Sequence, residues 1–192
     1  MIRILKSRRA LSTVVTTLII LVVSILLASV LVYFAVNVVS TRVQQESLSV
    51  TNVHIWVNSA GKAEGALMIS NIGGRDVVIN QIEVRGIPLT WTNVYYLYAV
   101  NTGTTPDAGL TMRLPYQTYP VTATGVMLGT TQIFANNLVQ AASQLVLPSG
   151  GVMIIYTNDP NSVTINDIGT TIGFTVFTAQ AIYYQETNVQ AA

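Results

Sequence analysis

An unbroken uncharged stretch, residues 11–39, is the feature that most constrains how this chain folds. As a helix it would be about 44 Å long at about 1.5 Å per residue. The hydrocarbon layer of a membrane is only about 30 Å thick. Helices in soluble cores usually have about 8 to 20 residues and one polar face. We therefore expect a membrane-spanning helix with length to spare.

A basic leader, residues 1–10, stands directly before this stretch and carries four of the nine basic residues of the chain. Lys and Arg next to an apolar segment remain on the cytoplasmic side of the membrane. The leader therefore predicts an N-terminus inside the cell and everything after residue 50 outside. We divide the chain into this leader, a hydrophobic helix with a polar extension over residues 11–47, and a head over residues 48–192.

Three kinds of N-terminal segment share this pattern of charge followed by hydrophobicity. A secretory signal peptide has an apolar region of about 7 to 15 residues and a small-residue cleavage motif. The stretch here is much longer, and no A-x-A pattern closes it. A permanent single-span anchor is compatible with the sequence. So is a pilin-type leader, which is cut where charge meets hydrophobicity so that the helix is kept.

The surplus length of the helix favours a role in packing against other helices. Small residues four apart, Ser24 and Ala28, let two helix backbones approach closely. Polar residues also recur every four positions and so form one stripe; they are Ser29, Tyr33, Asn37 and Thr41. Scattered Ser and Thr are common in any membrane helix, so the stripe alone leaves both readings open. A helix over residues 11–47, about 55 Å long, suits one that leaves the bilayer and packs against copies of itself.

Beyond residue 48 the helical period gives way to short β-branched and aromatic segments separated by Gly, Pro, Asn and Asp. We expect strands near 50–57, 65–71, 76–85, 89–100, 109–114, 120–128, 131–147, 151–157 and 171–185. The predicted fold class is α+β, with a long N-terminal hydrophobic helix followed by an antiparallel, immunoglobulin-like β-sandwich head.

Three segments of the head carry sharper expectations. In residues 76–85 the apolar residues alternate, with a slip in phase near Gln81 that suggests a β-bulge. The apolar run over residues 152–156 suggests a central strand buried on both faces. Residues 131–144, rich in Ala, Asn and Gln, fit either a short helix or a long polar hairpin.

Composition excludes several functions. Charged residues make up 9% of the chain, against about 25% in a typical soluble domain, which suggests a surface covered by partners or sugar. Residues 11–192 carry five basic and eight acidic groups, a net charge of −3, so no basic stripe remains for nucleic acid. The chain lacks cysteine and the Asn-x-Ser/Thr acceptor of N-linked sugar. We expect no cofactor.

No residue pattern indicates catalysis. His54 is the only histidine and lies in an expected strand, and a zinc site would need three or four clustered ligands. Asp159 and Asp167 flank a loop that could hold calcium, although a turn-forming stretch explains it better. An aromatic patch suggests core or subunit contact, or less often a sugar-binding face; it consists of Trp91, Tyr95, Tyr96 and Tyr98.

Residues 6–48 resemble the N-terminal segment of archaeal type IV pilin-like proteins, the group of adhesion pilins and archaellins, with a class III signal peptide. The resemblance implies cleavage between Ala10 and Leu11, with Arg8 and Arg9 as recognition charges. Residues 70–86 and 147–156 also look like the β-rich heads of these subunits. Bacterial type IV pilins carry a Glu at the fifth mature position, where this chain has Val15.

The resemblance implies a structural subunit of an extracellular filament, not an enzyme, that resides in the plasma membrane before assembly. Its partners would be copies of itself, a prepilin-type peptidase, and an assembly ATPase with its membrane platform. An adhesion pilus is favoured over an archaellum because the segment after the leader lacks a glycine-rich start. The alternatives are an archaellin, or a membrane-anchored surface protein that binds sugar through the aromatic patch.

Overall fold

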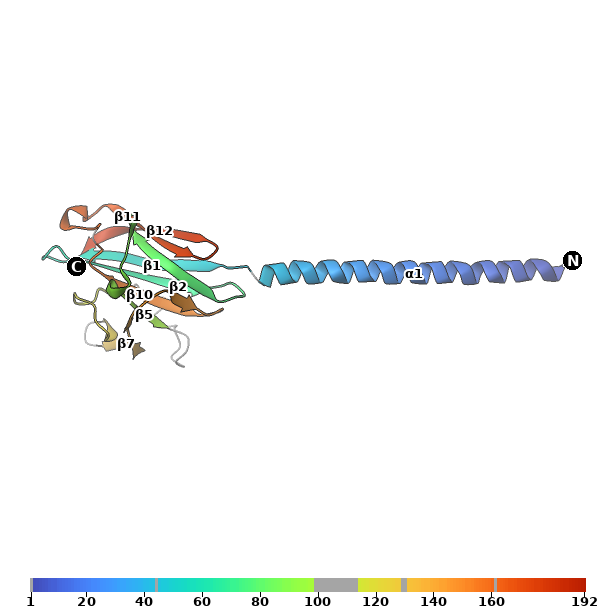
Figure 1. Ribbon diagram of the computed structural model, residues 1–192, viewed down its shortest axis with the longest axis horizontal. Helices are drawn as coiled ribbons and strands as arrows, with labels where there is room; N and C mark the ends of the chain where they lie inside the picture. The colour runs from blue at the N-terminus through green and yellow to red at the C-terminus, as the bar shows by residue number, and fades with distance from the viewer. Residues whose placement is uncertain (1, 44, 99–113, 129–130, 161) are drawn as a thin grey trace. The chain divides into compact units, whose positions relative to one another are not determined.

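The structure is a computed structural model that describes residues 2–43, 45–98, 114–128, 131–160 and 162–192. Its contacts divide the chain into two compact units, residues 1–44 and 45–192. The first unit is helix α1 (Ile2–Val43), and the second, here called the head, contains the strands (Figure 1). The long apolar helix and the mostly antiparallel sheet confirm the predicted α+β class.

Helix α1 is continuous because no glycine or proline occurs before Gly61, and all its interior backbone groups bond within the helix. It ends at Val43, earlier than residue 47, where the sequence placed the end of the polar extension. The reason is a competing interaction within the head. The Ser47 carbonyl accepts hydrogen bonds from the N–H groups of Ile72 and Gly73, at 3.0 and 3.1 Å, and residues 45–47 belong to no helix or strand.

The strands of the head begin and end close to the turn-forming residues of the sequence. Ten of them form one sheet: β1 (Leu48–Val57), β2 (Ala63–Asn71), β3 (Val77–Val84), β4 (Ile87–Pro88), β5 (Val94–Tyr98), β8 (Val139–Gln140), β9 (Leu145–Leu147), β10 (Val152–Asn158), β11 (Thr171–Thr178) and β12 (Ile182–Ala191). A separate hairpin joins β6 (Gly125–Leu128) to β7 (Thr131–Asn137). Two short 3-10 helices, η1 (Trp91–Asn93) and η2 (Ile165–Asp167), lie between strands.

The sheet has the order β4-β3-β11-β12-β1-β2-β10-β5-β8, with β9 added beside β3. Strand β12 joins its two halves, because residues 182–188 pair with β11 and residues 189–191 pair with β1. The β1–β12 pairing is parallel, and the other pairings are antiparallel. The strands thus form one continuous sheet, and the immunoglobulin-like sandwich is not confirmed.

The head has two hydrophobic clusters. The first draws side chains from both halves of the sheet, such as Ile55 and Ile69 from one half and Ile79 and Phe174 from the other. The second lies on the opposite face of β1, β2, β5 and β10, where side chains such as Leu114, Val121 and Leu138 cover the sheet. The strands at the centre of the sheet are therefore buried on both faces.

Most of the sharper expectations are confirmed. In β3, Gln81 pairs with Phe177 and Ile79 with Thr178, so Asn80 is the extra residue of the predicted bulge. Strand β10 sends alternate side chains into the two clusters, as Ile155 and Tyr156 illustrate. The single strand expected over residues 171–185 is instead two strands, β11 and β12. Residues 131–147 form strands β7, β8 and β9, not a helix, and the strand expected at 109–114 lies mostly outside the described residues.

Candidate functional site

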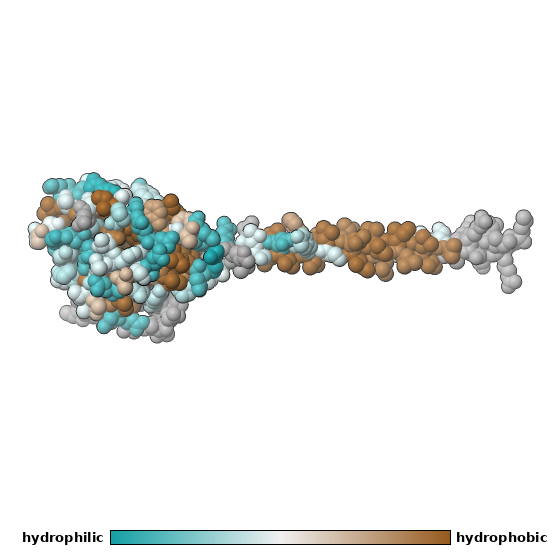
Figure 2. All heavy atoms as spheres, viewed as in Figure 1, coloured by the Kyte–Doolittle hydropathy of each residue, from teal (hydrophilic) through white to brown (hydrophobic). Residues whose placement is uncertain are grey.

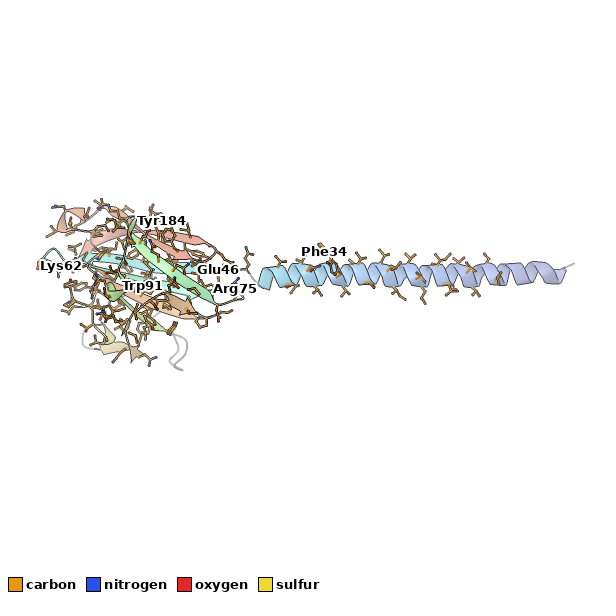
Figure 3. All side chains as sticks on the ribbon, viewed as in Figure 1. Phe34, Glu46, Lys62, Arg75, Trp91 and Tyr184 are labelled. Carbon is orange, nitrogen blue, oxygen red and sulfur yellow. The ribbon has the colours of Figure 1, made fainter. Side chains whose placement is uncertain are left out.

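Most of the exposed large hydrophobic side chains of the described chain lie on helix α1. Residues Leu11–Thr41 carry no charge, and each of their side chains is exposed within the structure. Among the described residues this is the one helix long and apolar enough to cross a membrane. Figure 2 shows the hydrophobic side chains along it, and Phe34 projects from it, 66% exposed (Figure 3). Such a helix is compatible with membrane anchoring or with secretion.

Several serine and threonine hydroxyls on α1 bond to carbonyls of the helix itself. Ser24 Oγ donates to the Ile20 carbonyl at 2.7 Å, and Ser29 Oγ donates to the Ile25 carbonyl at 2.8 Å. Thr41 Oγ1 donates to the Asn37 carbonyl at 2.8 Å. A bonded hydroxyl carries little desolvation cost in an apolar environment. Three of the predicted assembly residues are therefore compatible with lipid or with a neighbouring helix, and need neither.

Two of the predicted assembly residues differ from these hydroxyls. The Tyr33 hydroxyl and the Asn37 side-chain amide make no hydrogen bond to any described residue. Tyr33 is also 72% exposed. In hydrocarbon, an amide without a partner costs on the order of a few kcal/mol. Asn37 is therefore the group on α1 that gains most from a polar partner on another chain.

The small residues of α1 leave a shallow groove on one face. Ala28 and Ser29 are the smallest side chains that line it. The groove is lined by Ile25, Ala28, Ser29, Val32, Tyr33 and Val36. The structure thus brings Ala28, Ser29 and Tyr33 together, whereas Ser24, Asn37 and Thr41 lie elsewhere along the helix.

The predicted cleavage site lies inside α1. The helix runs from Ile2 through the Ala10–Leu11 bond without a break. Leu11 is 70% exposed. The side chains of Arg8, Arg9 and Ala10 lie outside the described part of the structure. Their role as recognition and cleavage residues stays a prediction.

A set of polar contacts that the sequence did not reveal lies beside residues 45–47, where the head begins. Asn71, only 2% exposed, donates from Nδ2 to the carbonyls of Arg75 and Leu147 at 2.8 and 3.0 Å. Its Oδ1 accepts the Gly73 N–H at 3.0 Å. Ser149 Oγ donates to the Gly73 carbonyl at 2.7 Å. We call this set of contacts the neck turn. Asn71 is the last residue of β2, and the sequence alone does not show that its side chain is buried.

The aromatic patch is divided between the two hydrophobic clusters. Trp91, Tyr96 and Tyr98 pack against the first cluster, and Tyr95 packs against the second. Tyr96 and Tyr98 meet edge to face, with ring centroids 5.4 Å apart. His54 is 9% exposed and stacks on Trp56 at 5.3 Å. These contacts favour packing over sugar binding for the patch, and they place His54 in the core.

The two aspartates of the predicted loop hold structure in place. Asp159 pairs with Lys62, and this hydrogen bond raises the pKa of the lysine. Asp167 accepts from the Thr164 N–H and from Arg85, and these bonds lower the pKa of the carboxyl. Each carboxylate is thus engaged separately. Among the described residues no cluster of three metal-ligating side chains occurs.

The chain matches no model of a known protein family, and no curated protein shows recognisable similarity to it.

Proposed function

We propose that this chain is a structural subunit of an extracellular archaeal type IV pilus-like filament that polymerises through α1. One observation carries the proposal: an uncharged stretch of 31 residues within α1, Leu11–Thr41, in which every side chain is exposed. At about 1.5 Å per residue this segment is about 46 Å long, some 16 Å more than the hydrocarbon layer needs. A simple tether has no use for the extra turns, whereas a helical bundle does.

The energetics of assembly support the same conclusion. A helix that buries on the order of 1,500 Å² against its neighbours gains tens of kcal/mol, at about 25 cal/mol per Å², before the entropy of association is subtracted. No charge lies between Leu11 and Thr41 to be buried without a partner. The hydroxyls bond internally, and Asn37 and Tyr33 remain to bond between copies.

In this proposal the chain is inserted into the membrane with its N-terminus inside. A prepilin-type peptidase removes residues 1–10 by cutting between Ala10 and Leu11. An assembly ATPase and its membrane platform then move α1 from lipid into the filament. The head, with its own complete core, faces the medium and contacts the surface to which the cell adheres.

Shearing cells and collecting the released material without detergent tests this proposal. We expect the chain to sediment as a high-mass species, and the intact mass of its subunit to lack residues 1–10. Subunits that retain residues 1–10 would contradict the processing step. A chain found only in the membrane fraction, released as a monomer by detergent, would instead support a single-span anchor.

A further inference from the structure

A carboxyl group lies fully buried in the head. Glu64, on β2, pairs across the sheet with Trp56 on β1 and with Asn158 on β10. Its residue surface is 0% exposed. It lies on β2, which also contributes Ala66 and Met68 to the second hydrophobic cluster, where residues such as Leu114 and Val121 pack against the sheet. A Glu in such a place is rare unless another group compensates for its burial.

The only hydrogen bond of this carboxyl, among the described residues, joins the sheet to the segment that covers it. Glu64 Oε1 accepts the Gln117 N–H at 2.8 Å. Its other oxygen, Oε2, is buried and has no partner in the described structure. A single backbone bond does not repay the cost of burying a full negative charge.

Two further side chains hold the same covering stretch, residues 115–121, which we call the cover segment. Asn158 accepts the Val121 N–H with Oδ1 and donates from Nδ2 to the Val121 carbonyl, both at 2.8 Å. Tyr156 donates its hydroxyl hydrogen to the Pro115 carbonyl at 2.9 Å. Glu64 bonds between these two anchors, at Gln117. Of the three side chains, Glu64 is the one whose charge depends on pH in the ordinary range.

No cation is available to Glu64 from the described elements around it. Lys62, just before β2, has a half-exposed side chain that forms an ion pair with Asp159. His54 on β1 stacks on Trp56, and the cover segment contributes only tyrosines, Tyr116 and Tyr119. The Tyr156 pKa is raised by burial and by the nearby Glu64 charge. The neighbours that the structure describes therefore do not stabilise an ionised Glu64.

The protonation of this group follows from its burial. Burial raises the pKa of Glu64 to about 8, although the Gln117 N–H acts in the opposite direction. Once exposed to water, the carboxyl would titrate near its usual value of about 4.5. Between about pH 4.5 and pH 8, the closed head thus holds a proton that an opened head has lost.

We propose that Glu64 is a proton-controlled latch, which holds the cover segment on the sheet in its neutral form and favours release as the medium becomes alkaline. The closed state binds the extra proton, so its stability falls as pH rises from about 4.5 to about 8. Each pH unit in that window favours opening about tenfold. Above about pH 8 Glu64 is ionised in both the closed and the opened head, and the stability of the closed head no longer depends on pH through this group. The head is thereby most tightly closed in acid, whether or not the chain forms filaments.

Hydrogen exchange tests the latch on the full chain in detergent micelles. Exchange of peptides covering residues 115–121 would be followed by mass spectrometry from pH 5 to pH 8 and corrected for the intrinsic chemical rate. We expect the opening constant to rise about tenfold per unit in the middle of this range and about 400-fold in all, because the slope flattens near each pKa. In Glu64→Gln, which cannot ionise, the corrected constant should be flat. Glu83→Gln, on β3, should keep the wild-type slope.

Equal slopes in the wild type and Glu64→Gln, or a flat wild-type profile, would overturn the latch. If Glu64→Gln does not fold, carbon-13 NMR of labelled glutamate carboxyls in the wild-type chain decides the matter. A carboxyl that titrates near pH 8 supports the latch. Conventional titration of every glutamate, near pH 4.5, contradicts it.

Discussion

At the scale of single residues, two glycines show how tightly the sheet is packed. A Cβ on Gly65 would lie 2.6 Å from Cζ of Phe174 and from Oγ1 of Thr157, and both residues are fully buried. A Cβ on Gly173 would instead meet the ring end of Tyr184, which is 60% exposed and seen at the surface of the head in Figure 3. The two close approaches differ in whether the neighbour can move away.

This difference predicts unequal costs for the same substitution. We expect Gly65→Ala to lower the free energy of unfolding by about 1–3 kcal/mol, because Phe174 cannot move without disturbing the core. Gly173→Ala should cost less, since Tyr184 can swing into solvent. Urea unfolding of the head followed by Trp56 and Trp91 fluorescence measures both. A larger loss for Gly173→Ala would contradict the packing described here.

A second residue-scale prediction concerns Asn37. If its amide bonds between copies of α1, Asn37→Leu should weaken each helix contact by about 0.6 kcal/mol, roughly threefold. Filaments of this variant should dissociate at a lower temperature, as followed by light scattering. Ser24→Ala is the matched control, because the Ser24 hydroxyl already bonds to Ile20. Equal dissociation temperatures for both variants and the wild type would show that the Asn37 amide does not bond between copies of α1.

At the scale of elements, the neck turn joins the start of β1 to the strands beside it. Asn71→Ala would remove bonds to Arg75, Leu147 and Gly73, two of which satisfy carbonyls. We expect a loss of about 2–3 kcal/mol in the free energy of unfolding, measured by urea unfolding of the full chain in micelles.

The control for this prediction is Asn188→Ala, on the exposed face of β12, where the side chain accepts a single bond from Thr171. It should change the stability by less than about 0.5 kcal/mol. Similar losses for Asn188→Ala and Asn71→Ala would show that the neck turn adds nothing beyond an ordinary surface contact.

The spacing of apolar residues along the sequence predicted most helices and strands, because this local pattern decides which of the two a segment forms. The uncharged stretch predicted α1, and the phase slip near Gln81 predicted the bulge at Asn80. The remaining features of the fold depend on contacts between residues that are far apart in the sequence. The split of residues 171–185 into β11 and β12 depends on a turn at residues 179–181 that carries no Gly or Pro.

The candidate site was predictable to a similar depth. The stripe on α1 was visible in the sequence, but its hydroxyls could be separated from Tyr33 and Asn37 only once their bonds were known. No pattern in the sequence indicated that Glu64 would be buried. Its burial depends on a cover segment that lies about fifty residues further along the chain.

At the scale of the whole molecule, the two units have different roles in the proposed filament. Helix α1 supplies the polymer contacts, and the head supplies the surface, with a core of its own. An adhesion pilus and an archaellum share this division. Deleting the gene should reduce attachment of cells to surfaces and leave swimming unchanged. Loss of swimming with normal attachment would assign the chain to the archaellum.

The central claim is that α1 is buried against copies of itself in the assembled state. Helical reconstruction by electron microscopy of sheared surface material, with the subunit identified by mass, measures this directly. The claim predicts fibres with a core of packed helices, in which residues 11–41 touch neighbouring chains and the β-rich heads lie outside. Preparations that contain no fibres, with the chain recovered singly in lipid, would contradict it.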